Sequence, residues 1–108
     1  MSRTTVATDV ATALRLSTAA PTGAVAEAVR GRLREHIKAH ADQADRYAHS
    51  LPEGRARDVA IDTVRHARTL LAAQSGRDPA ASLRLLAKGA DYLSRYASAQ
   101  ETAVRPAA

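Results

Sequence analysis

Four histidines give this sequence its most regular spacing of chemically active side chains. His36 and His40 lie four residues apart, a helical spacing that can place two imidazoles on one metal ion. A helical hairpin near the middle of the chain would bring His66 level with His40. A metal site formed by His36, His40 and His66 is therefore one hypothesis. The preferred expectation is that the chain holds no metal and no other cofactor, because the positive charges of Lys38 and Arg65 lie beside two of these histidines.

The three aromatic residues are all tyrosines. Tyr92 and Tyr96 are one helical turn apart, and Tyr47 belongs to another helix that should reach the same end of the molecule. A tyrosine combines a large apolar ring with a hydroxyl that needs a partner, which suits a ligand pocket or a protein interface. The alternative is that tyrosines replace phenylalanine at the rim of the core. The candidate ligand-binding residues are His40, Tyr47, Tyr92 and Tyr96, placed between the helices.

Two carboxylate-histidine pairs are spaced to orient an imidazole as a base. Asp45 precedes His49 by one helical turn, and Asp62 precedes His66 in the same way. Such pairs are far commoner as plain surface contacts, and the sequence has no Gly-x-Ser-x-Gly motif and no phosphate-binding loop. No catalytic residue is predicted, and whether the protein is an enzyme stays open.

Apolar side chains spaced by threes and fours predict the elements that position these residues. The pattern marks three long amphipathic helices at residues 24–50, about 55–74 and about 79–103. Pro21 and Gly23 precede the first, Pro52 and Gly54 separate it from the second, and Asp78 is a typical cap before the third. Because the connections are short, neighbouring helices should run antiparallel. The predicted fold is an all-α up-down bundle.

The N-terminal segment adds a short helix to this bundle. Its apolar stripe is narrow and predicts a helix from about Thr5 to Leu16 that frays or packs only on a partner. The predicted organisation is an N-terminal segment with a short helix and linker (residues 1–23), a helical bundle (residues 24–103) and a disordered tail (residues 104–108).

Composition predicts a thin core. Alanine fills 26 of the 108 positions, and phenylalanine and tryptophan are absent. Helices that meet through alanine bury little apolar area, so self-association through an alanine-rich face would compensate. The chain has no cysteine, and Asp9 and Arg15 interrupt the apolar residues near its start. We therefore expect a cytoplasmic protein with no membrane span, working as a homodimer or with another protein.

The net charge of +5 raises the question of nucleic acid. Four acid-base pairs at helical spacing should neutralise much of the surface, namely Glu27–Arg30, Glu35–Lys38, Asp42–Arg46 and Asp91–Arg95. Five arginines remain unpaired in this interpretation: Arg32, Arg34, Arg68, Arg77 and Arg84. The last helix is long for a recognition helix and lacks a cluster of base-reading side chains. Nucleic acid is not an expected partner.

Three segments carry a family resemblance: residues 32–37 (RLREHI), 51–54 (LPEG) and the pair 85–88 (LLAK) with 92–96 (YLSRY). Over residues 25–100 the chain resembles a family of small helical actinobacterial proteins of unknown function, some labelled natural-product biosynthesis proteins. It departs from that family where Ala97 replaces the acidic residue common after the aromatic one. The resemblance implies the fold and a genomic setting. The leading hypothesis is an interaction or accessory protein, with a regulatory role as one form of it. A cofactor-free small-molecule binder or biosynthetic enzyme is the alternative.

Overall fold

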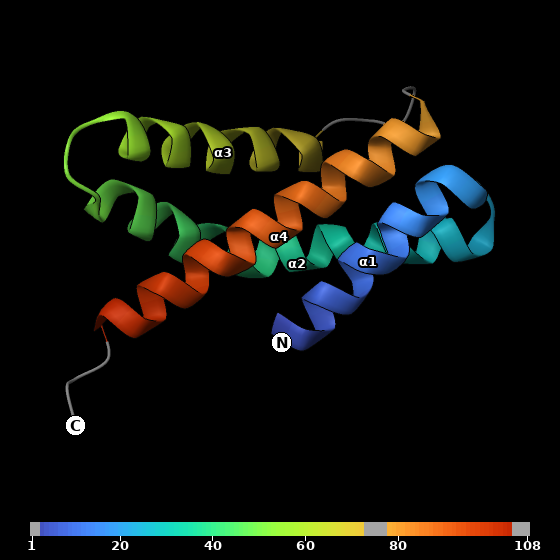
Figure 1. Cartoon of the computed structure of the whole chain (residues 1–108), viewed down its shortest axis with the longest axis horizontal. Coiled ribbons are helices and arrows are strands. Elements are labelled where there is room, and N and C mark those ends of the chain that lie inside the picture. The colour runs from blue at the N-terminus through green and yellow to red at the C-terminus, as the bar shows by residue number, and fades with distance from the viewer. Residues whose placement is uncertain (1–2, 73–77, 105–108) are drawn as a thin grey trace.

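The computed structural model describes residues 3–72 and 78–104 and contains four helices and no strand within those ranges (Figure 1). The helices are α1 (Arg3–Ala19), α2 (Ala24–Ser50), α3 (Arg55–Ala72) and α4 (Pro79–Val104). The prediction of an all-α bundle with three long helices and a further N-terminal one is confirmed.

Backbone geometry explains why the helices begin and end at the predicted positions. Gly23 precedes α2 with a φ of 101°, a conformation that glycine adopts without steric cost. Leu51 follows α2 in an extended conformation, as expected for a residue before proline. Before α4, the side chain of Asp78 accepts a hydrogen bond of 3.1 Å from the backbone amide of Ala80.

Contacts between the helices give the topology. Arg30 of α2 donates to the carbonyl of Pro79 at the start of α4, and Tyr47 lies against Tyr96 near the other end of both helices. α2 and α4 therefore run in the same direction, and α4 crosses α2 at an angle, with α3 running back between them along the chain (Figure 1). Gly89 of α4 is buried where α2, α3 and α4 meet. A Cβ atom there would lie 3.4 Å from Ile37 and 3.5 Å from Ala67.

The core is built largely from alanine, with a few larger aliphatic side chains between the helices. The buried alanines of α2, α3 and α4 include Ala26, Ala41, Ala44, Ala60, Ala67, Ala87 and Ala90. The largest fully buried apolar side chains are Leu33, Ile37, Leu83, Leu93, Val6, Val29 and Val64. The prediction of a thin, alanine-rich core is confirmed, but those buried alanines are not free to contact another chain.

The ends of the chain differ from the sequence prediction. α1 is longer than expected at both ends, and Val6 and Ala13 are fully buried in the core, so the helix packs on its own chain. The last helix was predicted to end near residue 103, and α4 continues to Val104, the first residue of the predicted tail. The rest of the predicted disordered tail, residues 105–108, and the predicted end of the second helix at Gln74 lie outside the described residues.

Arg30 joins three parts of the molecule. Its side chain pairs with Glu27 at 2.9 Å, as predicted, and also donates to the backbone carbonyls of Pro21 at 2.7 Å and Pro79 at 2.9 Å. The residue is only 6 % exposed. A guanidinium has enough donors to satisfy all three acceptors at once. Arg30 therefore fixes the α1–α2 connection against the start of α4.

Candidate functional site

The three tyrosines form one cluster on α2 and α4. The rings of Tyr47 and Tyr96 are stacked with centroids 5.3 Å apart, and the rings of Tyr92 and Tyr96 are tilted with centroids 6.3 Å apart. Tyr96 packs against the core, whereas Tyr92 is 47 % exposed. We call Tyr47, Tyr92 and Tyr96 the tyrosine surface. The stacked rings contact each other directly, so the space between them is filled.

The length of α1 explains why the tyrosine surface is open to solvent. Asp9 of α1 contacts Arg32 and His36 of α2, so α1 lies along the first part of α2. Figure 1 shows α1 beginning near the middle of the molecule, with α2 and α4 extending beyond it. Tyr47 lies three helical turns after His36 on the same face of α2. α1 therefore covers this face of α2 at His36 but does not extend as far as Tyr47.

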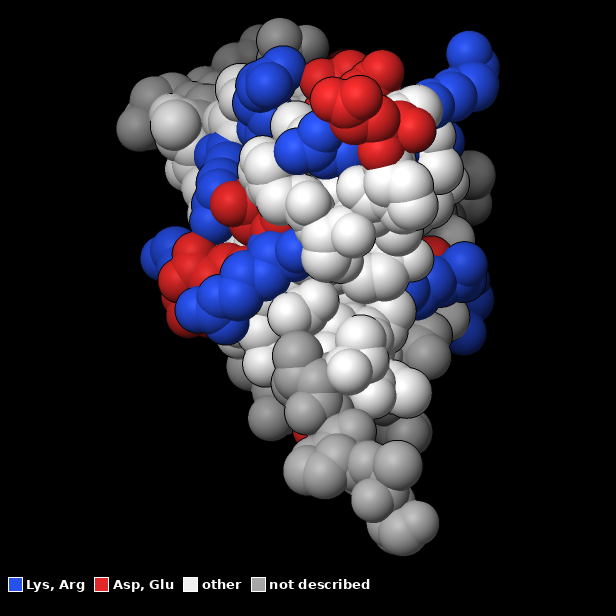
Figure 2. All heavy atoms as spheres, turned by 90° about the vertical axis from the view of Figure 1, so that its left-hand side faces the viewer, with Lys and Arg blue, Asp and Glu red and all other residues white. Residues whose placement is uncertain are grey.

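The space-filling view of this end of the molecule agrees with that description. Figure 2 shows side chains without charge forming a continuous area, with Lys, Arg, Asp and Glu residues along both sides. The C-terminal ends of α2 and α4 lie at this end (Figure 1). A centre without charged side chains and a charged border fit the usual anatomy of a protein interface.

His40 lies two helical turns before Tyr47 on α2. It is half-buried, and its Nε2 atom is buried without a hydrogen-bond partner in the described structure. Burial lowers the pKa of His40, and the nearby His36 lowers it further. Both effects favour the neutral imidazole. His40 and Tyr47 therefore lie near one another on one face of α2, but the structure gives no contact between the His40 ring and a tyrosine.

A buried ionic cluster between α1 and α2 is a feature that the sequence analysis missed. His36 Nε2 donates to Asp9 Oδ2 at 2.7 Å, and Arg32 Nε donates to Asp9 Oδ1 at 3.0 Å. Asp9 and His36 are only 6 % and 2 % exposed. Burial raises the pKa of the Asp9 carboxyl, but the hydrogen bonds and charges of His36 and Arg32 outweigh burial and lower it overall. Asp9 is therefore an ionised acceptor that docks α1 on α2.

The hypothetical metal site is not assembled. No group of three or more His, Cys, Asp or Glu side chains suited to a metal ion occurs among the described residues. His36 points at Asp9 of α1, and His66 lies exposed on α3. His36 is only 2 % exposed, so it is part of the interior and not a surface residue.

The ion pairs correct the predicted charge pattern. Glu35–Lys38 and Asp91–Arg95 form as expected, but Asp42 contacts Arg68 at 2.8 Å. Two of the arginines assigned as unpaired, Arg32 and Arg68, hold carboxylates of other helices. Sequence spacing reveals pairs within one helix and cannot reveal pairs between helices.

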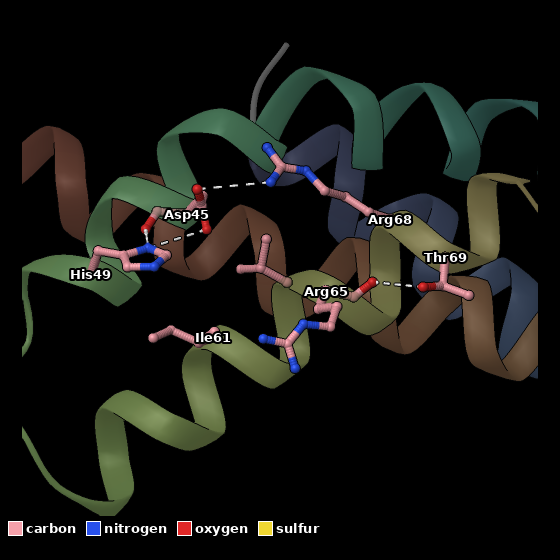
Figure 3. Close-up of a pocket in the computed structure, with 7 residues that line it drawn as sticks. Asp45, His49, Ile61, Arg65, Arg68 and Thr69 are labelled. Carbon is pink, nitrogen blue, oxygen red and sulfur yellow. Dashed lines mark hydrogen bonds and ion pairs between the residues drawn. The ribbon is translucent and has the colours of Figure 1, made fainter.

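A concave region lies between α2 and α3 and has a volume of about 390 Å³ (Figure 3). The predicted pair of Asp45 and His49 forms at its edge, with 3.3 Å between Oδ1 and Nδ1. In the other candidate pair, Asp62 contacts Arg65 at 3.0 Å in place of His66. We call this region the α2–α3 groove.

The fold and these sites define the class of protein: a small all-α bundle with an exposed aromatic surface at one end. Within the described residues, no helix has the length and apolar character needed to cross a membrane. The chain belongs to a family of unknown function (DUF6415), whose sequence model matches residues 4–102. No curated protein and no solved structure gives a significant match to the chain.

Proposed function

We propose that the protein is a small helical interaction module that pairs with a second copy of itself through the tyrosine surface. The observation that carries this proposal is the cluster of Tyr47, Tyr92 and Tyr96, in which Tyr47 stacks on Tyr96 and Tyr92 is 47 % exposed beyond the reach of α1. Tyrosine is enriched in interfaces because its ring buries a large area while its hydroxyl tolerates water. An aromatic ring that is about half exposed can stack on another ring without any rearrangement of the core.

Charge on α4 supports a second copy as the partner. Asp91 and Arg95 lie beside Tyr92 on successive turns and contact each other at 3.1 Å. In two antiparallel copies of α4 related by a two-fold axis near residue 93, each Asp91 would face the partner's Arg95. An interface of this kind is self-complementary, as a two-fold dimer requires.

The proposed setting is an accessory or regulatory role in the cytoplasm of an actinobacterium, within a natural-product pathway. The resemblance of residues 32–37, 51–54, 85–88 and 92–96 to actinobacterial proteins with that label supports this setting. The alternative, a small-molecule binder or enzyme using a pocket of His40, Tyr47, Tyr92 and Tyr96, has less support. Stacking of Tyr47 on Tyr96 fills the space that such a pocket would need.

Sedimentation velocity across protein concentrations from micromolar to about 100 μM tests the proposal. We expect the wild-type protein to sediment as a dimer, with twice the 11.4 kDa mass of the chain. Tyr92→Ser should shift the protein to monomer, because it removes the exposed ring at the centre of the interface. Val25→Ser is the matched control, since Val25 is 65 % exposed at the start of α2 and should leave the dimer intact.

Two other outcomes would contradict the proposal. A wild-type monomer at 100 μM would exclude self-association. A Tyr92→Ser dimer as stable as the wild-type dimer would place the interface elsewhere on the molecule.

A further inference from the structure

The α2–α3 groove has the volume of a small-molecule site and is partly open to solvent. Its volume of about 390 Å³ falls in the usual range for such sites, which is roughly 300–1,000 Å³. It is lined by residues of α2 on one side and of α3 on the other, and none of the three tyrosines contributes to it. The groove is therefore separate from the tyrosine surface.

The floor of the groove is apolar. Val64 is fully buried beneath it, and Ile61 is half-buried and lines the same region. Figure 3 shows Ile61 on α3 across from His49 on α2. An apolar segment of a ligand lying on these two side chains would be removed from water.

Three side chains that can carry positive charge line the groove: His49, Arg65 and Arg68. Arg68 is already held by two carboxylates of α2, Asp42 at 2.8 Å and Asp45 at 3.8 Å. It closes one part of the groove and is not available to a new anion without breaking these contacts.

Arg65 is differently placed. It contacts the carboxylate of Asp62, one turn earlier on the same helix, and both side chains are more than two-thirds exposed. Exposed ion pairs of this kind contribute little to stability, so the guanidinium can exchange Asp62 for another carboxylate at small cost. A guanidinium also binds a carboxylate through two parallel hydrogen bonds.

His49 is oriented by Asp45. Its Nδ1 atom lies 3.0 Å from the backbone carbonyl of Asp45 and 3.3 Å from the Asp45 carboxylate. Both partners are acceptors, so Nδ1 carries the proton. In Figure 3 the other ring nitrogen points away from Asp45. The ring is thus fixed at the α2 side of the groove, with Arg65 on the α3 side.

We infer that the α2–α3 groove binds a small organic monoanion with an apolar chain, such as a medium-chain carboxylate. The carboxylate contacts Arg65, the apolar chain lies on Ile61 and Val64, and His49 bounds the ligand on the α2 side. The Asp45 carboxylate at the edge favours a monoanion over a more highly charged ligand. This inference goes beyond the proposed self-association and does not depend on it.

Titration of the full-length protein with hexanoate, followed by ¹H–¹⁵N NMR spectroscopy, tests the inference. We expect saturable shifts of amides around Ile61, Arg65 and Thr69. Acetate has the charge without the chain and should bind at least about tenfold more weakly. 1-Hexanol has the chain without the charge and should bind about two- to fivefold more weakly. Tyr92→Ser should bind hexanoate as the wild type does, which separates this site from the dimer interface.

Two charge-matched variants locate the anion contact. Arg65→Gln should weaken hexanoate binding by about two- to fivefold, the loss expected for an exposed ion pair. Arg84→Gln removes the same charge from the exposed surface of α4 and should leave binding unchanged. The inference is overturned if hexanoate causes no saturable shifts, if hexanol binds equally well, or if the two variants behave alike.

Discussion

Asp9 and His36 show, at the scale of the residue, how a polar pair can dock one helix on another. The Asp9 carboxylate accepts hydrogen bonds from both His36 and Arg32, so it stays charged inside the protein. Removing one member of such a buried pair leaves a charge without its partner, which costs about 3–5 kcal/mol in other proteins. We therefore regard this cluster as part of the folded structure, with α1 held on α2 by it.

His40 should make stability sensitive to mild acid. Its pKa is lowered from 6.5 in the folded state, so the unfolded chain binds a proton more readily. By linkage, the free energy of unfolding is unaffected well above pH 6.5 and falls as the pH drops below 6.5 towards the folded pKa. We expect urea unfolding to show this loss in the wild type between pH 7.5 and 5.

His40→Phe is the comparison that isolates this effect. The variant keeps a ring and removes the buried Nε2 atom that lacks a partner. The other histidines are common to both proteins, and the lowered pKa of Asp9 keeps that carboxylate ionised over this range. The free-energy difference between variant and wild type should grow in favour of the variant as the pH falls. A difference that does not change with pH would contradict the role of His40.

Sequence spacing identified the tyrosines as neighbours but not the buried ionic cluster. Tyr92 and Tyr96 are one turn apart on a well-marked helix, so their proximity follows from helix geometry alone. Asp9 and His36 are 27 residues apart and meet only because α1 packs against α2 in one register. Asp9 looked like an interruption of an apolar segment, and no local signal marked it as buried.

At the scale of the element, the helix boundaries were the most predictable feature. α2 occupies the predicted residues, and α3 and α4 begin where they were expected, because proline, glycine and an Asp cap mark those positions locally. The extent of α1 was not predictable in this way. Val6 and Ala13 form too narrow an apolar stripe to suggest a helix of 17 residues. The packing of α1 also depends on residues of other helices, which the sequence of α1 alone does not reveal.

Two glycines give opposite predictions for helix stability. Gly31 lies inside α2 on the exposed surface, and a Cβ there would meet nothing within 4 Å. Gly31→Ala should therefore raise the free energy of unfolding by about 0.5–1 kcal/mol, because alanine loses less backbone entropy in a helix. Gly54 precedes α3 with a φ of 148°, which alanine adopts only with strain. Gly54→Ala should lower the free energy of unfolding.

Thermal and urea unfolding of both variants measure these effects, with the far-ultraviolet circular dichroism of α-helix as the signal. A loss of stability in Gly31→Ala would show that α2 needs glycine at that position for a reason beyond helix propensity. Such a reason would be a contact made by the exposed surface of α2 in the assembled state.

At the scale of the whole molecule, one short helix both completes the core and leaves the tyrosine surface open. α1 has 17 residues and α2 has 27, so α1 cannot cover the full length of its neighbour. It supplies the core with Val6 and Ala13 and covers the first part of α2. The same arrangement leaves Tyr92 exposed at the far end. The position of the proposed interface is therefore a consequence of how α1 docks.

Deleting residues 1–20 tests whether α1 is part of the folding unit or an appended segment. The deletion removes Val6 and Ala13 from the core and leaves His36 and Arg32 without the Asp9 carboxylate. With a core made mostly of alanine, little apolar burial remains to offset these losses. We expect the shortened chain to lose its cooperative thermal transition in calorimetry.

Leu14→Ser in the full-length chain alters the exposed side of α1 and should retain the transition. If the shortened chain unfolded cooperatively near the wild-type temperature, residues 24–103 would form an independent bundle, and the opening at the tyrosine surface could not be attributed to α1.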